Sequence, residues 1–215
     1  CMTDNRRMTT DRFYGGVSNR LSNLRAMLEY INETNPPRSQ LNSWVISNTR
    51  AGSKDAVGHH LAFLRSIDII ELSDMRCELA KYGSEYLRNN DPVTLYEALN
   101  AGVKGFDLLI NEIAERPMTD EDIMNLLVSE FEEAEMSKPG PAVRHREWLQ
   151  VLGFAKREDG VNRITEKGLE LTRQEVDSEN ETEAQVQRRK TELEQELDSE
   201  PRLTSETEQF TDSRR

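Results

Sequence analysis

The chain has 215 residues, of which 35% are hydrophobic and 32% are charged, and its formal net charge at pH 7 is −12. That length suffices for one medium domain or for two small domains of about 80 residues each. Because no run of 18 apolar residues occurs and the first residues are polar, we expect neither a transmembrane helix nor a secretory leader. Two cysteines, Cys1 and Cys77, are too few for a disulfide framework, which predicts a cytoplasmic protein.

The acidic residues are concentrated toward the C-terminus. From Gln174 onward there are 13 acidic and 6 basic residues, whereas residues 1–173 hold 27 acidic and 22 basic ones. The basic residues comprise 21 Arg but only 7 Lys. This composition resembles that of proteins from salt-accumulating halophiles, and the alternative is an ordinary acidic protein with a disordered tail. In the halophilic case the net charge reflects the solvent, so an acidic pI does not exclude a nucleic-acid ligand.

The first third of the chain predicts three helices, two short strands and a further helix. Apolar residues at helical spacing define the helices, Asn35-Pro36-Pro37 ends the first of them, and a β-rich run interrupted by a turn defines the strands. The expected helices are Val17–Asn32, Ser39–Ser47 with Ser39 as its cap, Lys54–Ser66 and Tyr82–Arg88, and the strands are 69–72 and 76–79. A short helix over Asp91–Ala101 is expected to follow as a link.

The same order of elements recurs 85 residues later. Residues 60–87 align without a gap on residues 145–172, and the aligned pairs include His60 with His145, Phe63 with Trp148, and Gly83 with Gly168. The second set comprises a helix over Val103–Glu115, a helix capped by Thr119, a helix from Lys138-Pro-Gly-Pro141 to Gly153, strands over 154–158 and 161–165 joined by Asp159-Gly160, and a helix over Glu166–Arg173.

Three helices followed by a hairpin are the winged helix-turn-helix arrangement, so the predicted fold is mainly α with two tandem winged helices. The expected divisions are a flexible N-terminus (1–16), a first winged-helix domain (17–90), a linking helix (91–102), a second winged-helix domain (103–173) and an acidic, partly helical or disordered tail (174–215). Within the tail, residues 183–199 favour a helix by propensity, and the composition after Pro201 is that of disorder.

Both sets resemble prokaryotic winged-helix DNA-binding proteins. His60–Glu71 and Leu79–Leu87 resemble the third helix, wing and final helix of that family, although Asp68 and Ala80 replace its usual glycine and threonine. Trp148–Phe154 and Ile164–Gly168 fit the pattern more closely.

The segment between the two sets carries a second resemblance. Tandem winged helices joined by a segment such as Asn90–Ile110 are similar to target-recognition modules of restriction proteins, and the resemblance covers about residues 17–173. Together with the composition it implies a prokaryotic, haloarchaeal protein that binds double-stranded DNA. Such a protein would act as a transcriptional regulator or as the recognition part of a restriction or defence system.

Duplex recognition places polar and basic side chains on the outer face of the third helix and on the wing. The predicted DNA-binding residues are Lys54, His59, Arg65, Lys138, Arg144, Arg146, Lys156, Arg157 and Arg163. We expect the second set to contribute more, because Lys138–Arg157 carries five basic residues against one acidic one. The alternative for these residues is a solvated charge without a ligand.

Other conspicuous residues favour structural roles. We expect Phe63 and Trp148 to be core, His60 and His145 to make structural hydrogen bonds, and Asp120-Glu121-Asp122 to be solvated carboxylates at a helix start. No HExxH, CxxC, phosphate loop or GxSxG motif is present, so the prediction is a non-enzyme without metal or cofactor.

Two further functional hypotheses stay open. One is a winged-helix protein-interaction scaffold that does not bind DNA, and the other is that one domain binds DNA while its counterpart packs or dimerises. The acidic tail is expected to be a solvated strip, a homodimerisation or protein-binding helix, or a DNA-mimicking segment. No membrane partner is expected.

Overall fold

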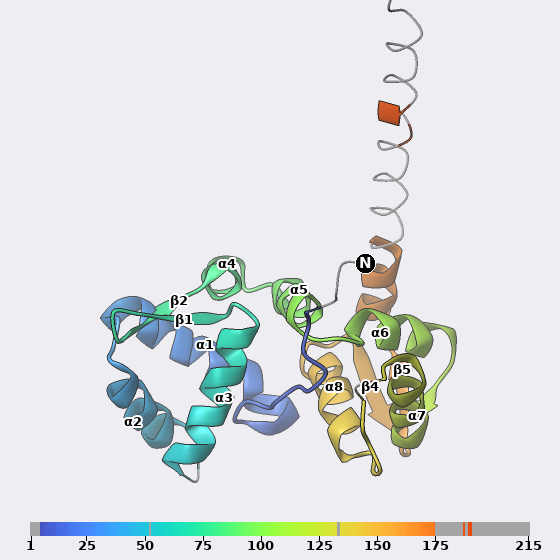
Figure 1. Cartoon of the computed structure of the whole chain (residues 1–215), viewed down its shortest axis with the longest axis horizontal. Coiled ribbons are helices and arrows are strands. Elements are labelled where there is room, and N and C mark those ends of the chain that lie inside the picture. The colour runs from blue at the N-terminus through green and yellow to red at the C-terminus, as the bar shows by residue number, and fades with distance from the viewer. Residues whose placement is uncertain (1–4, 52, 133, 175–186, 188, 191–215) are drawn as a thin grey trace, which may run out of the picture. The chain divides into compact units, whose positions relative to one another are not determined.

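Residues 16–89, the first half, form three helices, a two-stranded hairpin and a fourth helix (Figure 1). The computed structural model describes residues 5–51, 53–132, 134–174, 187, 189 and 190. The elements are α1 (Gly16–Thr34), α2 (Arg38–Asn48), α3 (Lys54–Ser66), β1 (Ile70–Ser73), β2 (Arg76–Leu79) and α4 (Lys81–Asn89). Their order and approximate bounds confirm the prediction for this part of the chain. The start of α2 differs, because Pro37 rather than Ser39 occupies the N-cap position.

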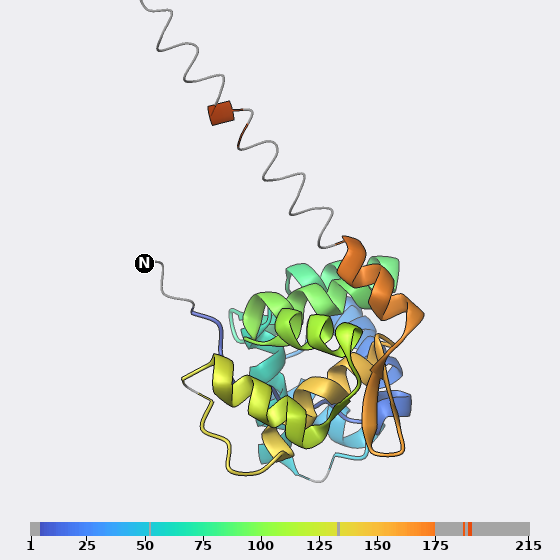
Figure 2. The ribbon, with the colours of Figure 1, turned by 90° about the vertical axis from the view of Figure 1, so that its right-hand side faces the viewer.

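The second half, residues 106–174, follows the linking helix α5 (Pro92–Gly102). It contains α6 (Phe106–Glu115), β3 (Met118–Thr119), α7 (Asp120–Glu130), α8 (Gly140–Val151), β4 (Ala155–Glu158), β5 (Val161–Ile164) and helical backbone over 166–174 (Figure 2). The mainly helical class with small antiparallel sheets is therefore confirmed. The sequence missed β3, which pairs with β5 through Met118–Asn162 and Thr119–Val161, because two residues are too few to show a strand period.

Local chemistry explains where the second half begins its helices. Gly105 has φ of +92°, a conformation that favours glycine, so α6 starts at Phe106 rather than at Val103 as predicted. Thr119 forms a capping box with Asp122: Thr119 Oγ1 accepts from the Asp122 amide at 3.1 Å, and Asp122 Oδ2 accepts from the Thr119 amide at 2.8 Å. The predicted Thr119 cap is confirmed.

One hydrophobic core extends through both halves. Phe63 and Trp148, the aligned aromatic residues, are each only 1% exposed, and their ring centroids lie 6.3 Å apart. Both are therefore core residues, as predicted. The described residues up to 173 form one compact unit, and its division into two domains stays a prediction.

The N-terminal arm, residues 7–14, is packed where the sequence predicted a flexible segment. The Arg7 amide donates to Gly102 O at 3.0 Å, and the Lys104 amide donates to Arg7 O at 2.9 Å. Further along, Phe13 is 2% exposed in the core. The adjacent aromatic pair Phe13-Tyr14 was the sequence signal for this packing, because such residues are rare in flexible polar segments.

Gly83 and Gly168 occupy matching positions against the hairpins. An added Cβ at Gly83 would overlap the carbonyl oxygen of Ile69, and one at Gly168 would overlap the carbonyl oxygen of Phe154. We expect Gly83→Ala and Gly168→Ala each to lower the free energy of unfolding by about 2 kcal/mol, because the clash outweighs the roughly 1 kcal/mol that alanine contributes in a helix. Urea denaturation measures this.

Gly140→Ala is the matched control, because nothing lies within 4 Å of its added Cβ. It should leave stability unchanged or raise it slightly. Equal midpoints for the variants at positions 83, 168 and 140 would contradict the close helix–hairpin packing.

The remaining predictions about the termini fall largely beyond the described part. Cys1, the helix over 183–199 and the segment after Pro201 lie outside the described residues, except for helical backbone at 187, 189 and 190. Among the described helices, none is long and apolar enough to cross a membrane.

Candidate nucleic-acid interface

The outer face of α3 is exposed and basic. Ser53 caps the helix by accepting from the Ala56 amide at 3.2 Å. Val57, Leu61 and Leu64 point into the core, so the opposite side of the helix faces solvent. Lys54, His59 and Arg65, three of the predicted DNA-binding residues, lie on that side and are exposed.

A second element contributes to this surface. Arg38, the first residue of α2, reaches across α3 so that its Nη2 lies 3.8 Å from the position a Cβ would occupy on Gly58. Between Arg38 and Arg65 the outer side of α3 carries the small residues Gly58 and Ala62, and one exposed carboxylate, Asp55, lies in its first turn. We call Arg38, Lys54, His59 and Arg65 the α3 face. None of the four makes an ion pair among the residues that the structure describes.

The corresponding helix of the second half, α8, is packed on its outer side. Arg144 is exposed but donates from Nη1 to Thr10 O of the arm at 3.3 Å. On the same side, Glu147 Oε2 lies 2.6 Å from Arg12 Nε of the arm and 3.7 Å from Arg20 Nη2 of α1. The arm and α1 thus contact the side of α8 that corresponds to the α3 face. Val151, near the end of the same side, is only 8% exposed.

Asp120 holds two of the predicted DNA-binding arginines. Its Oδ1 accepts from Arg146 Nε at 3.0 Å and from Asn162 Nδ2 at 3.0 Å, and its Oδ2 accepts from Arg157 Nη2 at 3.2 Å. The Asp120 side chain is 18% exposed and that of Arg146 is 11% exposed. The expectation that the Asp120-Glu121-Asp122 run is solvated is therefore wrong for Asp120, which is an ion-pair centre.

The carboxylate of Asp120 is stabilised in its charged form. Burial alone would raise its pKa, but the hydrogen bonds from Arg146 and Asn162 and the charges of Arg146 and Arg157 outweigh burial and lower it. Since the pKa of the folded state is depressed, the stabilisation is present at neutral pH. It disappears as the pH falls through the folded pKa, below about 4.

Asp120→Asn should lower the free energy of unfolding by about 2 kcal/mol at pH 7, because two arginines lose their partner. The difference in free energy of unfolding between this variant and the unmodified chain should shrink below about pH 4, where the carboxyl group of Asp120 protonates in both the folded and the unfolded state. Urea denaturation at pH 7 and at pH 3 tests both statements. Glu121→Gln, an exposed neighbour on α7, is the control and should change little. A loss no greater than that of Glu121→Gln at pH 7 would contradict the role of Asp120.

The other predicted residues lie on the surface of the second half. Lys138 precedes α8, Arg163 lies on β5, and both are exposed. Lys156 on β4 is exposed and pairs with Glu158 at 3.0 Å. The structure thus brings Lys54, His59 and Arg65 together on one helix. The predicted residues of the second half are spread over α8, the segment before it and the β4–β5 hairpin, and three of them pair with carboxylates.

Sequence reasoning missed Arg38 and the Asp120 centre. The alignment did contain a signal for the latter, because Arg146 corresponds to Leu61, a buried position. A charged residue at such a position requires a buried partner. In the case of Arg38, no local pattern distinguished it from the other exposed arginines, since its position over Gly58 depends on how α2 crosses α3.

Of the two aligned histidines, His145 makes the structural hydrogen bond that was predicted, and His60 contacts a carboxylate of the arm. His145 is 1% exposed and its Nε2 donates to Lys104 O at 3.1 Å. His60 Nδ1 lies 3.2 Å from Asp11 Oδ2. Within the described ranges, no group of three His, Cys, Asp or Glu residues could hold a metal ion.

Comparison with known proteins leaves the chain without an assigned family. No family model matches it. No curated protein matches either. Among solved structures it is similar to the BpuJ1 endonuclease binding domain in complex with pyrene- and phenanthrene-modified DNA. The identity is 11%, the match covers 77% of this chain and 83% of that one, and the TM-score is 0.47. With a TM-score below 0.5, no conclusion about fold or ligand follows from this likeness.

Proposed function

We propose that this protein binds double-stranded DNA by inserting the α3 face into the major groove, and that its two halves are copies of a winged helix-turn-helix unit. The observation that carries the proposal is the exposed α3 face itself. It presents Arg38, Lys54, His59 and Arg65 without an ion-pair partner in the described chain, although acidic residues outnumber basic ones overall. Unpaired basic side chains on such a helix fit a polyanionic ligand.

The shape of this face also fits a duplex. An α-helix with its side chains is about 10–12 Å across, and the major groove is about 12 Å wide. Because Gly58 and Ala62 have no long side chains, nothing bulky projects from the centre of the exposed side of α3, so the helix backbone can approach base edges closely. Arg38 and Lys54 are then placed to contact phosphates, and His59 and Arg65 to contact base edges.

The second half has a supporting role in this proposal. Because the arm and α1 contact the outer side of α8, and Asp120 holds Arg146 and Arg157, we assign α8 to positioning the first half rather than to reading bases. Arg163 and Lys156 on the hairpin remain candidates for phosphate contacts. This reverses the expectation that the second half contributes more, and it develops the hypothesis that one domain binds while its counterpart packs.

The biological role that we propose requires DNA binding but no catalysis. We propose a DNA-binding protein that acts as a transcriptional regulator or as the recognition part of a restriction system, and that is not itself an enzyme. A cytoplasmic, halophilic setting is part of the same proposal. It is supported by the excess of Arg over Lys and by the acidic composition.

Fluorescence anisotropy tests the proposal with a pool of labelled duplexes, plain and methylated, between about 0.1 and 2 M KCl. We expect saturable binding, and Lys54→Ala combined with Arg65→Ala should weaken it about tenfold or more. Each lost phosphate contact should reduce the slope of log affinity against log salt by about one. Arg88→Ala, a 78% exposed arginine on α4, is the control and should bind like the unmodified chain. Equal affinities for all three proteins would contradict the assignment of the α3 face.

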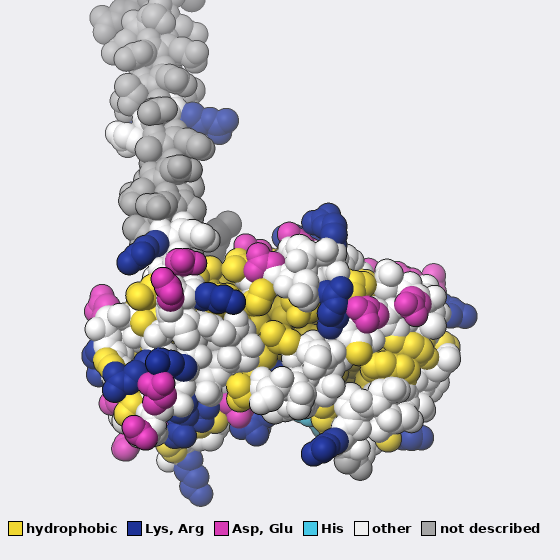
Figure 3. Space-filling view, turned by 180° about the vertical axis from the view of Figure 1, so that it is seen from behind, with side chains coloured by type: hydrophobic (Ala, Val, Ile, Leu, Met, Phe, Trp, Pro, Cys, Tyr) yellow, Lys and Arg dark blue, Asp and Glu magenta, His cyan; other side chains and the backbone are white. Residues whose placement is uncertain are grey.

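The scaffold hypothesis has one observation in its favour. Figure 3 shows hydrophobic areas among intermingled acidic and basic side chains on the rear face of the molecule. Tyr30 on α1 and Trp44 on α2 stack with ring centroids 5.0 Å apart and are partly exposed. If no duplex binds at any salt concentration, the hypothesis that such an apolar surface binds a protein partner is favoured.

A further inference from the structure

A cavity of about 430 Å³ lies where the N-terminal arm meets α1, α3 and α8. Small-molecule sites have volumes of about 300–1,000 Å³, so this one is large enough for a ligand of mononucleotide size. Its lining combines the aromatic residues Phe13 and Tyr14, the turn Gly15-Gly16, and the charged or titratable residues Asp11, Arg12, Arg20, His60, Arg144 and Glu147.

Arg20 is the unusual member of this lining. Its side chain is 1% exposed, and its guanidinium carbon lies 4.9 Å from the centre of the Trp148 ring. Only Nη2 approaches an acid, at 3.7 Å from Glu147 Oε2, while Nε and Nη1 have no hydrogen-bond acceptor in the described part of the chain. Buried charged donors without acceptors are rare and unfavourable, and they point to an acceptor supplied from outside the chain.

The charge balance of the cavity is positive. Both carboxylates are already engaged, since Asp11 Oδ2 lies 3.2 Å from His60 Nδ1 and Glu147 Oε2 lies 2.6 Å from Arg12 Nε. Three guanidinium groups therefore face two carboxylates. Arg12 has a side chain that is 47% exposed, and Arg144 is exposed as well, so cations line the solvent side of the cavity.

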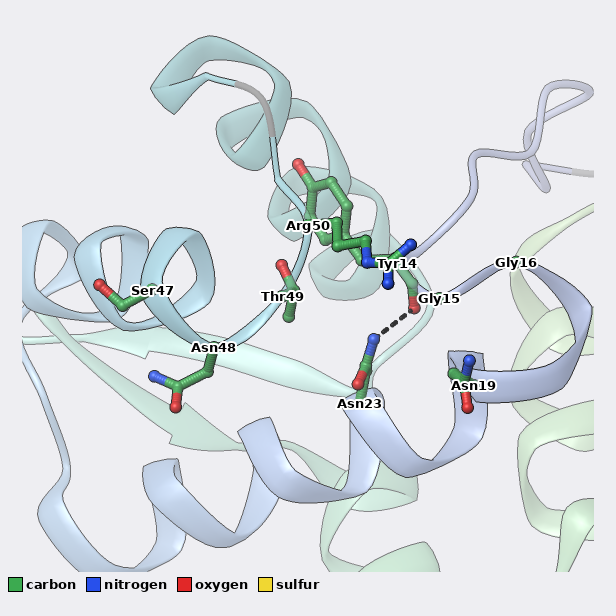
Figure 4. Close-up of a pocket in the computed structure, with 9 residues that line it drawn as sticks. All are labelled: Tyr14, Gly15, Gly16, Asn19, Asn23, Ser47, Asn48, Thr49 and Arg50. Carbon is green, nitrogen blue, oxygen red and sulfur yellow. Dashed lines mark hydrogen bonds between the residues drawn. The ribbon is translucent and has the colours of Figure 1, made fainter.

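The turn beside Arg20 adds backbone donors. Gly15 and Gly16 have φ of +111° and +58°, and α1 begins there with neither a side-chain cap nor an acidic residue in its first turn. The amides at such a helix start attract anions. The same turn also lines a second cavity of about 660 Å³, whose residues are drawn in Figure 4. The lining of this second cavity includes Asn19 and Arg50, and none of its described residues is a carboxylate.

We propose that the cavity beside Arg20 binds the phosphate group of a small phosphate-bearing molecule of mononucleotide size. Arg20 supplies the buried donors, Arg12 and Arg144 close over the anion from the solvent side, and the Gly15-Gly16 turn contributes amides. The remainder of the ligand extends toward the second cavity. Because the lining comes from the arm, α1, α3 and α8, the ligand ties the two halves together. This inference does not depend on DNA binding.

Isothermal titration calorimetry on the full chain tests the site with AMP and with inorganic phosphate, using chloride at matched ionic strength as the reference. We expect saturable binding of AMP with one site per chain. Arg12→Gln and Arg144→Gln, both at exposed positions that should fold normally, should each weaken it at least tenfold. Arg88→Gln should not change it. In a Trp44→Phe background, AMP should also change the fluorescence of Trp148, which lies beneath Arg20.

Three outcomes would overturn the proposal. The first is an absence of saturable binding by either probe, and the second is binding that Arg12→Gln and Arg144→Gln leave intact. The third is displacement of AMP by stoichiometric duplex DNA, which would assign the site to the nucleic-acid backbone instead. Retained AMP binding in the Lys54→Ala, Arg65→Ala double variant would support a site separate from the α3 face.

Discussion

Trp148→Ala should lower the free energy of unfolding by about 4 kcal/mol, a large share of the 5–15 kcal/mol that is typical of a domain. The indole is 1% exposed and packs at 6.3 Å from Phe63 across the two halves. Its removal leaves a cavity, deprives Asp11 O of its 2.7 Å hydrogen bond, and takes the aromatic surface away from the Arg20 cation. Urea denaturation followed by circular dichroism measures the change.

Two controls separate the contributions of Trp148. Trp148→Phe keeps most of the packing but loses the donor to Asp11 O, so it should cost roughly 1–2 kcal/mol. Trp44→Ala removes a partly exposed tryptophan and should cost much less than Trp148→Ala. In Trp148→Ala, limited proteolysis should also cut the arm faster. A loss of stability for Trp148→Ala that does not exceed that for Trp44→Ala would contradict the role of the indole between the halves.

Acidification should destabilise the protein through His145. Burial lowers the pKa of His145 to about 4, against the opposing effect of its hydrogen bond to Lys104 O. Above the unfolded pKa of about 6.5 both states are neutral and the histidine makes no pH-dependent contribution. Between about pH 6.5 and 4 the unfolded state binds a proton that the folded state does not, so stability falls, by up to about 3 kcal/mol.

Urea denaturation at a series of pH values isolates this effect when the unmodified chain is compared with His145→Gln. The variant should be less stable at pH 7, and the gap between the two proteins should narrow as the pH falls toward 4. Phe106→Leu, which alters a ring 5.0 Å from the imidazole, should instead shift stability without changing the slope. If the free energy of unfolding varied with pH in the same way for the unmodified chain and His145→Gln, His145 would not be buried in its neutral form.

Short-range patterns predicted most of the fold. The Thr119 cap, the proline stop at 36–37 and the turn at Asp159-Gly160 act through neighbouring residues, so the bounds of most helices and hairpins followed from the sequence. What the sequence did not reveal depends on contacts between distant segments. The arm is fixed by hydrogen bonds to α5, α8 and the α5–α6 connection, and the two-residue strand β3 exists only because β5 lies beside it.

The same distinction applies to the candidate interface. Lys54, His59 and Arg65 could be placed on an exposed face from helical periodicity alone, because Val57, Leu61 and Leu64 mark the buried side of α3 in the sequence. The outer face of α8 could not, since the residues that contact it, Thr10 and Arg12, are more than 130 positions away in the chain. Charge counting over residues 138–157 likewise could not show that Arg146 and Arg157 pair with Asp120.

The most direct test of the central claim compares aligned positions in the two halves. His59 on α3 and Arg144 on α8 correspond in the alignment, and both are exposed. Benzoylphenylalanine is incorporated in place of each residue, and the protein is irradiated with a bound, labelled duplex. Our account predicts efficient crosslinking to bases from position 59 and little from position 144. Crosslinking from position 144 with none from position 59 would contradict it.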